Sequence, residues 1–417
     1  MTVVHLTEHA PAVSVPLPDA AGRAVAASRI LDTAAPDPYR KDHWVLRAGS
    51  KVGVVSLAVP GGDPLSVRIN PKVPIARLFF LIGYSLDPRG WRDGDVEVDG
   101  HDEVLPALAH AVERQVDRAL CKGALQGYRT VEESALVVRG RIREAEQMRR
   151  RFGAVLPVEI AYDEFTTDIA ENRILRAAVE RLLRLPGVPQ DVRRRLLHQR
   201  SRLVDVSPLV RGQELPVWHA TRLNARYHQA LRLAHAVLGG SSPEHTAGEL
   251  RIDGFLLNMN KLFEDFVTVA LREAYRGTDR TCRLQDPHHL DEAGEIRMQP
   301  DFVLYGPEGA PQAVADAKYK VEKSGGYPDA DLYQMLAYCT ALGLREGHLV
   351  YAKGNAPHAA HRVRHAGVVI HQHALDLDRG PAGLLGEIRS LAHRMAPADR
   401  PEPGGPGPGR GSVRGGR

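Results

Sequence analysis

The chain has 417 residues, of which 43% are hydrophobic and 25% charged, and its formal net charge at pH 7 is +4. This length allows two or three domains, and the composition is ordinary for a soluble globular protein. The small positive charge permits contact with nucleic acid but excludes a wholly basic, DNA-coating protein.

Targeting signals and cysteine patterns are both absent from the sequence. No apolar run approaches the length of a membrane span, and the first residues lack the basic start and apolar stretch of a signal peptide. Cys121, Cys282 and Cys339 are far apart and follow neither a zinc spacing nor a disulfide pattern. We therefore predict a cytoplasmic protein in a reducing compartment, without membrane association.

The N-terminal part divides into a leading segment and a β-rich domain. Residues 1–42 are rich in Ala, Pro and Asp with weak periodicity, and we expect this N-terminal segment to be poorly ordered or to form irregular β structure. Residues 43–160 carry short β-type runs from Trp44 onward and form a predicted β-rich domain. Apolar spacing predicts helices inside it at 75–84 and 104–122.

Helical spacing dominates residues 161–245, which we predict to be a helical middle region. Its expected helices cover 169–185, 188–204 and 221–238, and residues 239–246 are a plausible hinge.

Residues 246–395 alternate helices and strands and form the predicted last domain. We expect helices at 260–276 and 329–343, and strands at 282–286, 296–305, 312–320 and 347–352. The Pro-, Gly- and Arg-rich residues 396–417 should be a disordered tail. The predicted fold class is therefore α/β in the sense of a multidomain α+β protein.

The most informative stretch is residues 298–320, which is typical of two strands joined by a Pro-Glu-Gly turn. Asp301 stands at the head of the first strand, and Asp316 and Lys318 are two apart on the second, hence on one face. A carboxylate within an apolar strand is costly unless it is paired or binds metal. A structural Asp–Lys pair is the alternative, but two carboxylates and a lysine together suit Mg²⁺ held against a phosphate.

Two flanking helices supply further candidates. Glu264 lies at the margin of the apolar face of the helix at 260–276, whereas Asp265 lies on the solvent side. A boundary residue in a surface ion pair is the alternative for Glu264. Gln334 and Tyr338 are four apart on the following helix, so they share a face and could orient Lys318 or a phosphate. An ordinary polar helix edge is the alternative for that pair.

Magnesium prefers oxygen ligands, and the candidate donors are Asp301, Asp316 and the backbone carbonyl of Ala317, with Glu264 as a further candidate. Lys318 would orient the attacking water or stabilise the charge that develops on the phosphate. The resulting candidate catalytic set is Asp301, Asp316, Lys318, Glu264, Gln334 and Tyr338.

At these residues the sequence resembles a known family. Pro300-Asp301 followed by Asp316-Ala-Lys318 is similar to the PD-(D/E)xK nuclease signature. More narrowly, an ordered set of stretches across residues 45–355 resembles the McrC family, the nuclease subunit of McrBC-type modification-dependent (type IV) restriction systems. These stretches are LSVRINPKVPIARLFFLIGY, VRGRI, YDEFTTDIAENRILRAAVERLL, TRLNARYHQALRLA, NMNKLFEDFV, PDFVL, DAKYK and LYQMLAY.

The resemblance implies a C-terminal PD-(D/E)xK-type mixed-sheet domain and a Mg²⁺-dependent endonuclease acting on double-stranded DNA within a 5-methylcytosine- or modification-dependent restriction complex. It also implies a McrB-like AAA+ GTPase partner that is contacted and stimulated by residues 43–160. The sequence contains no G-x-x-x-x-G-K-[ST] phosphate loop, so GTP is expected on the partner. The alternatives are a regulatory or scaffold subunit that activates a partner GTPase, and a stand-alone nuclease of another DNA-defence or repair pathway.

Three other features have weaker functional interpretations. Arginines cluster at 139–143, 149–151 and 193–195, where DNA contact and a solvated face are both open, the latter being favoured for 193–195. His288 and His289 lack partners at metal-ligand spacing, which favours a loop pair. Asn172 is expected at a helix start rather than in catalysis.

Overall fold

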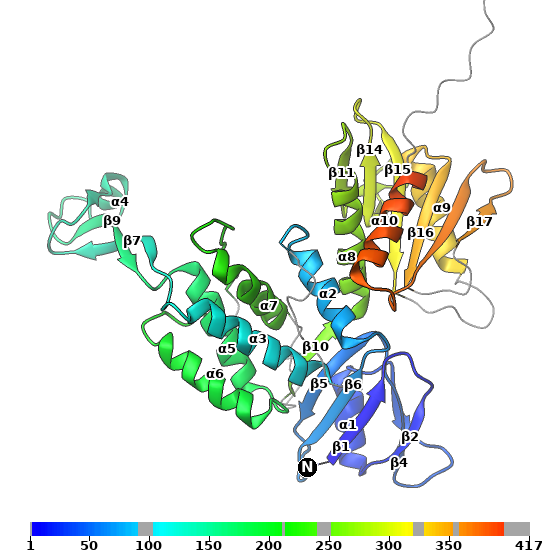
Figure 1. The fold of residues 1–417 in the computed structure, drawn as a ribbon, viewed down its shortest axis with the longest axis horizontal. Helices are drawn as coiled ribbons and strands as arrows, with labels where there is room; N and C mark the ends of the chain where they lie inside the picture. The colour runs from blue at the N-terminus through cyan, green and yellow to red at the C-terminus, as the bar shows by residue number, and fades with distance from the viewer. Residues whose placement is uncertain are drawn as a thin grey trace, which may run out of the picture. The chain divides into compact units, whose positions relative to one another are not determined.

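The computed structural model describes residues 2–90, 103–210, 213–239, 252–319, 329–352 and 358–395. The chain divides into two compact units, Met1–Phe266 and Val267–Arg417, which we describe separately (Figure 1). Mixed helices and sheets in both units confirm the predicted multidomain α+β class. Most of the predicted hinge and the whole tail lie outside the described residues.

Two small sheets make up the start of the first unit. One has the order β1-β6-β5-β10, with β1 parallel to β6 and the other neighbours antiparallel, and the second has the order β2-β4-β3. The elements are β1 (Thr2–Thr7), β2 (Val13–Pro16), α1 (Asp19–Ser28), β3 (Thr33–Pro36), β4 (His43–Arg47), β5 (Lys51–Leu57), β6 (Leu65–Asn70) and β10 (Ile252–Asn258).

The first 42 residues are more regular than the poorly ordered or irregular β structure that we expected. They hold three strands and a helix, because α1 buries a face of small side chains that gives little apolar signal in the sequence. Its Gly22 lies against Trp44, and a Cβ at that glycine would fall 1.9 Å from the indole ring. A close contact of this kind depends on glycine and cannot be recognised from hydrophobic spacing.

The strand β10 returns from the middle of the chain to the first sheet. Its seven residues pair in antiparallel register with β5, from Ile252 opposite Leu57 to Asn258 opposite Lys51. Gly53 permits this approach, since a Cβ there would lie 2.1 Å from the carbonyl oxygen of Phe255. Residues 252–258, assigned from the sequence to the last domain, thus form an edge of the N-terminal sheet.

Helices form the middle of the first unit, close to their predicted positions. They bury the apolar faces from which they were predicted, such as Leu108 and Val112 of α3 and Leu175 and Val179 of α5. The elements are α2 (Ile75–Leu86), α3 (Val104–Leu120), α5 (Ala170–Arg184), α6 (Gln190–Arg202), the short 3-10 helix η1 (Ala225–Tyr227) and α7 (His228–Gly239).

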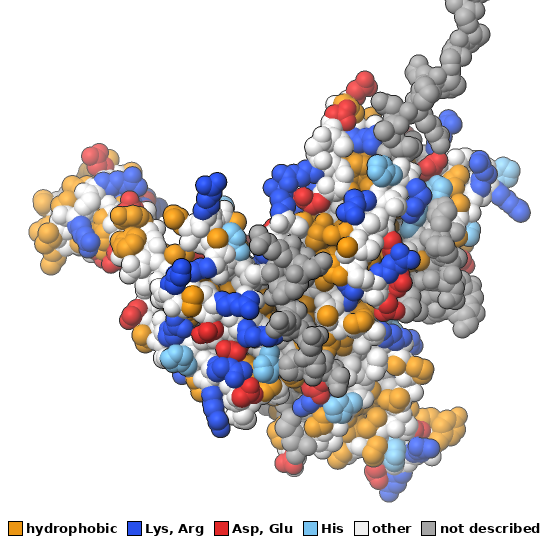
Figure 2. Space-filling view, in the orientation of Figure 1, with side chains coloured by type: hydrophobic (Ala, Val, Ile, Leu, Met, Phe, Trp, Pro, Cys, Tyr) orange, Lys and Arg blue, Asp and Glu red, His pale blue; other side chains and the backbone are white. Residues whose placement is uncertain are grey.

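Between α3 and α5, residues 127–166 form a small separate sheet with a short helix, which we call the arm. Its strand order is β7-β9-β8, from β7 (Gly127–Ala135), β8 (Arg141–Ile142) and β9 (Val158–Thr166), and α4 (Glu144–Arg150) joins β8 to β9. The arm exposes large apolar side chains: Leu136, Val137, Val138, Ile142, Met148, Phe152, Val155 and Leu156. Figure 2 shows apolar side chains gathered over the arm on the visible face.

The second unit is built on a six-stranded mixed sheet of order β11-β14-β15-β16-β18-β17. β14 and β15 form the predicted hairpin, β15, β16 and β18 are parallel, and β17 is antiparallel to β18. The elements of this part are α8 (Met259–Ala274), which spans the boundary of the units, β11 (Thr281–Leu284), β12 (His288–His289), β13 (Arg297–Met298), β14 (Phe302–Tyr305), β15 (Pro311–Lys318), α9 (Asp329–Leu342), β16 (Glu346–Ala352), β17 (His358–Arg362), β18 (Val369–Leu375) and α10 (Pro381–Met395).

One face of this sheet is covered by α9. Met335, Tyr338 and Cys339 of that helix pack with buried side chains of β14, β15, β16 and β18, among them Val314 and Leu349. Because side chains alternate along a strand, Asp316 and Lys318 share the face of Val314. The sheet therefore presents both residues on the side that α9 covers. Within the described part of the chain, no helix is both long and apolar enough to cross a membrane.

Candidate functional site

The hairpin places the predicted carboxylates next to each other. Asp301 directly precedes β14, and the pairing of Phe302 with Ala315 sets it beside the end of β15 that carries Asp316. The backbone N–H of Ala317 donates a 2.8 Å hydrogen bond to Oδ2 of Asp301. This bond fixes the Asp301 carboxylate against the second strand.

Asp316 and Lys318 form an ion pair between Oδ2 and Nζ. Asp316 is only 2% exposed, and the side chain of Lys318 is 20% exposed. The shared face that the sequence predicted is therefore present, and the direct pair is the contact that was given as the structural alternative. Such a pair is costly to remove from water, so it is weak support for a purely stabilising role.

Burial and the neighbouring charges shift the pKa values of both residues of this pair. Burial raises the pKa of Asp316, and the Asp331 carboxylate adds to the rise, while Lys318 opposes it without cancelling it. Burial alone would lower the pKa of Lys318, but the negative charge of Asp316, followed by Asp301 and Asp331, raises it above its usual value. Lys318 is therefore protonated at neutral pH and acts as a hydrogen-bond donor.

Gln334 and Tyr338 lie on the face of α9 that was predicted. Gln334 Nε2 donates a 2.8 Å hydrogen bond to the Tyr338 hydroxyl, which contacts the carbonyl oxygen of Gln299 at 3.4 Å. Burial raises the pKa of Tyr338, and the charges of Asp316 and Asp301 raise it further. Tyr338 thus belongs to the electrostatic surroundings of the two carboxylates.

Glu264 lies near the start of α8, in the first unit. Lys261 Nζ contacts Glu264 Oε1 at 2.9 Å and Asp265 Oδ1 at 3.0 Å. The Glu264 side chain is 21% exposed and that of Asp265 45%, in the order that helical spacing predicted. A part for Glu264 in the site formed by Asp301 and Asp316 stays a prediction.

Two residues near the site were missed from the sequence. Asp331, 4% exposed on the first turn of α9, accepts a 3.2 Å hydrogen bond from the Tyr351 hydroxyl. Its spacing of three and seven residues from Gln334 and Tyr338 puts it on their helix face, a signal that was available. The second is Gln285, whose Nε2 donates a 2.9 Å hydrogen bond to Oδ1 of Asp301. No sequence spacing points to that contact.

The donor chemistry of this site is compatible with Mg²⁺. Among the described residues, no group of three or more His, Cys, Asp or Glu side chains is arranged to hold a metal ion. The predicted ligand set has two carboxylates and a backbone carbonyl, and all of these donors are oxygens, as Mg²⁺ prefers. Burial raises the pKa of Asp316, and a divalent cation beside it would favour its charged form.

Most arginines of the three clusters have partners within the protein. Arg143 pairs with Glu132 at 3.0 Å, and the guanidinium of Arg139 stacks 4.2 Å from the ring centroid of Tyr162. Arg149 and Arg150 pair with Glu146, and Arg151 pairs with Glu159. Of the third cluster, Arg193 bonds carbonyl oxygens at the end of α5, and Arg195 pairs with Glu113 at 2.9 Å. These contacts favour structural roles.

The other weaker candidates also have structural explanations. His288 and His289 form the short strand β12, not the predicted loop pair, because they pair with β13. His288 Nε2 lies 3.0 Å from Oδ2 of Asp286, which also accepts a hydrogen bond from Tyr305. Asn172 lies in the first turn of α5, where its Nδ2 donates to the carbonyl oxygens of Leu125 and Thr167, both at 2.7 Å. It thereby ties this helix to the base of the arm, in agreement with the non-catalytic interpretation.

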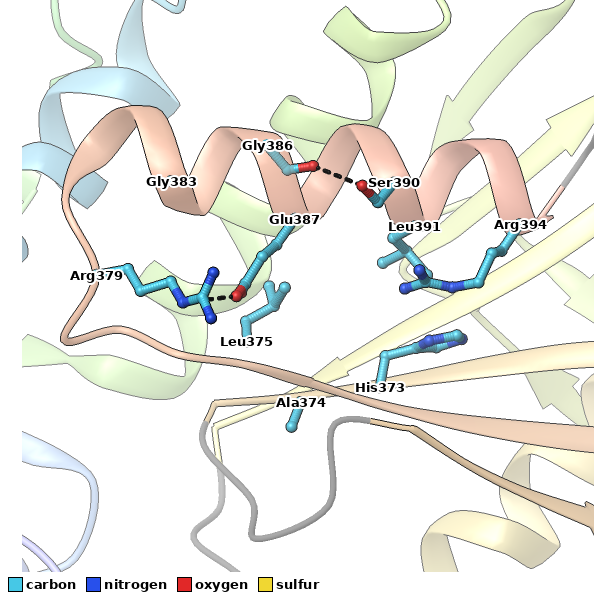
Figure 3. A pocket seen from close by; sticks show the side chains of 10 residues that line it. All are labelled: His373, Ala374, Leu375, Arg379, Gly383, Gly386, Glu387, Ser390, Leu391 and Arg394. Carbon is cyan, nitrogen blue, oxygen red and sulfur yellow. Dashed lines mark hydrogen bonds and ion pairs between the residues drawn. The ribbon is translucent and has the colours of Figure 1, made fainter.

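A cavity of about 580 Å³ lies between α10 and β18 (Figure 3). His373 and Leu375 of β18 form part of its lining, and Arg379 and Glu387 at its side are joined by a 3.1 Å ion pair. His373 is an odd number of residues from Ile370, which packs against α9, so it points to the opposite face of the sheet. The cavity is therefore separate from Asp316 and Lys318.

The fold and site define a multidomain α+β protein that carries a hairpin of two carboxylates and a lysine on a mixed sheet. Residues 46–352 match the model of a family described as "McrBC 5-methylcytosine restriction system component", and the chain belongs to that family. It is thus a component of a McrBC-type restriction system. No curated protein matches the sequence.

Two solved structures resemble the chain. One is a refined half-complex from a tetradecameric assembly of Thermococcus gammatolerans McrB AAA+ hexamers with bound McrC. Its TM-score is 0.56 at 18% identity, and the match covers 94% of this chain and all of that one, so it supports the fold. The second is a cryo-EM structure of the T. gammatolerans McrBC complex, with TM-score 0.38, 19% identity and coverage of 66% and 88%.

Proposed function

We propose that this chain is the Mg²⁺-dependent DNA endonuclease subunit of a McrBC-like, 5-methylcytosine- or modification-dependent restriction complex. The observation that carries the proposal is the buried Asp316–Lys318 ion pair, with Asp301 fixed beside it by the N–H of Ala317. A protein does not gain stability from such a buried group of charges as readily as from apolar side chains. The arrangement suits metal-assisted hydrolysis of a phosphodiester, which supports the proposal.

In this proposal Asp301, Asp316 and the carbonyl of Ala317 would hold the metal ion. When bound, Mg²⁺ would polarise the phosphodiester and lower the pKa of a coordinated water. Lys318, protonated because carboxylates surround it, donates a hydrogen bond to the attacked phosphate or to the water. Tyr338, held by Gln334, stays neutral because its pKa is raised, so it adds no negative charge beside the two carboxylates.

The proposed partner is a McrB-like AAA+ GTPase, because the half-complex from T. gammatolerans contains McrB AAA+ hexamers with bound McrC. We place the contact on residues 43–160, the region predicted to meet the partner, and there on residues 127–160 of the arm. Exposed apolar side chains such as Phe152, at 93%, and Val155, at 82%, favour a protein contact there. Double-stranded DNA would be the substrate, and GTP would bind to the partner.

The test compares the wild-type chain with Asp301→Asn and Asp316→Ala, each with the partner, GTP, Mg²⁺ and methylated DNA. We expect both variants to lose cleavage by at least about a hundredfold, the scale of a lost electrostatic stabiliser, and to keep stimulation of the GTPase. Cleavage that survives Asp316→Ala would refute the catalytic assignment. Stimulation without cleavage by the wild type would identify a regulatory subunit, and cleavage without any GTPase would identify a stand-alone nuclease.

A further inference from the structure

Gln285 holds Asp301 by two separate hydrogen bonds. Its backbone N–H donates to the carbonyl oxygen of Asp301 at 3.1 Å, and its side-chain Nε2 donates to Oδ1 at 2.9 Å. The other carboxylate oxygen, Oδ2, accepts the 2.8 Å bond from Ala317. With a donor on each oxygen, the plane of the carboxylate is fixed.

The backbone of Gln285 adopts a conformation that glutamine seldom takes. Its φ angle is +51°, in the left-handed region, where a side chain with a Cβ is strained. A glycine or asparagine would be favoured at this position if only the turn mattered. The strain is consistent with a requirement for the glutamine side chain.

Neighbouring groups hold Gln285 in place. Gln299 Nε2 donates a 2.9 Å hydrogen bond to the Gln285 carbonyl oxygen. The next residue, Asp286, is buried and accepts hydrogen bonds from Tyr305 and His288. The turn is therefore anchored on both sides, and the Gln285 amide is presented to Asp301 from a rigid support.

We propose that Gln285 is a positioning residue, whose amide presets the Asp301 carboxylate for binding a divalent cation. Each oxygen of a carboxylate offers about two lone-pair directions, so the bonds from Gln285 and Ala317 leave acceptor capacity on both oxygens. Partners of this kind orient metal ligands, and their removal usually weakens metal affinity. The inference rests on the proposed metal site at Asp301 and Asp316.

The first experiment measures Mn²⁺ binding to the full-length chain by titration calorimetry, without DNA or partner. Gln285→Met keeps the length of the side chain but removes the donor, and Gln285→Gly removes both the donor and the backbone strain. We expect both variants to bind Mn²⁺ about 10- to 100-fold more weakly than the wild type. Gln312→Met, at an exposed glutamine of β15, is the matched control and should bind as the wild type does.

The second experiment separates positioning from a general structural effect. Cleavage by Gln285→Met and Gln285→Gly should need a higher Mn²⁺ concentration for half-maximal rate and approach the wild-type rate at saturation. Asp301→Asn should stay inactive at every concentration. Thermal unfolding of the two Gln285 variants is measured in parallel. If their unfolding temperatures shift in opposite directions while both lose the same affinity for Mn²⁺, the loss of affinity is due to the missing amide.

Wild-type affinity for Mn²⁺ in both Gln285 variants would overturn the positioning role. If the wild type binds Mn²⁺ and Asp301→Asn does not, that result would leave the proposed metal site standing. If the wild type itself binds no Mn²⁺, or Asp301→Asn binds it equally well, the metal site is wrong and the role of Gln285 is refuted with it.

Discussion

The ion pair between Asp316 and Lys318 makes each of these residues depend on the other. Asp316 is almost wholly buried, and its pKa is raised even with Lys318 beside it. Without the lysine, the carboxylate would have to stay charged in an apolar strand or take up a proton. Either outcome lowers the free energy of unfolding, and a cation bound to the charged carboxylate would offset part of this loss.

We therefore expect Lys318→Met to lower the free energy of unfolding by about 3 kcal/mol, at the low end for a broken buried pair because Lys318 is partly exposed. Mg²⁺ should recover part of this loss, since its charge takes the place of the ammonium group. Urea unfolding with and without Mg²⁺ measures both effects. Equal stability of the variant in the two conditions would argue against a metal near Asp316.

The main residues of the site were accessible from the sequence, because side chains alternate along a strand and a short turn joins the two strands. Asp301, Asp316 and Lys318 need no long-range information to be placed together. The contact of Gln285 with Asp301 depends on how β11 pairs with β14 and on a left-handed backbone at Gln285. Tertiary pairing of that kind leaves no periodic signal in the sequence.

At the scale of single elements, the arm differs from the rest of the first unit. Its sheet is small, and its end carries apolar side chains that are more than half exposed, such as Leu136 and Val137. Its base is held by Asn172 and by the Tyr227 hydroxyl, which accepts a 2.8 Å hydrogen bond from the Leu125 N–H. An anchored element with an apolar end is suited to engage a partner protein.

We expect the double variant Phe152→Ser with Val155→Ser to weaken binding to the AAA+ partner about tenfold or more, as is typical when large interface side chains are removed. Its thermal unfolding should match the wild type, because both side chains are already exposed to solvent. Stimulation of the GTPase as a function of subunit concentration gives the readout. Tyr39→Ser, at a 94% exposed site outside the arm, is the control; equal effects of the two would exclude a specific role for the arm.

Elements with regular apolar spacing were predicted within a few residues. The helices α3, α5 and α6 are examples, because about four to five turns of helix give a clear period. The strands of residues 2–42 and the elements β17, β18 and α10 were missed. Four- to six-residue strands contain too few alternations to stand out, and α1 uses alanine and glycine for its buried face.

At the scale of the whole molecule, the last strand of the first sheet, β10, comes from the chain after the helical region. β10 contributes the buried Phe255 and Leu256, and the next helix adds Phe266, whose ring packs 5.5 Å from that of Phe80. The N-terminal unit thus needs residues beyond 245, where composition had placed the end of the helical region. Pairing between distant strands decides this border, and composition does not report it.

A fragment of residues 1–245 should therefore be less stable and less soluble than one of residues 1–276. The shorter fragment leaves β5 without its neighbour β10 and exposes a strand edge, which promotes aggregation. Soluble yield and thermal unfolding of the two fragments check this expectation. Equal behaviour would mean that β10 contributes little to the sheet.

The pairing of β5 with β10 also affects how the protein is made. About 200 residues separate Leu57 from Ile252, and at roughly 5–20 residues per second the ribosome needs on the order of 10–40 s to synthesise them. During that time β5 has no partner on one side, while the arm and the helices that follow it can already fold from local contacts. A nascent chain is therefore most susceptible to wrong strand pairing before residue 258 emerges from the ribosome. Synonymous codon changes that slow translation of the helical region should lower the yield of soluble, folded protein.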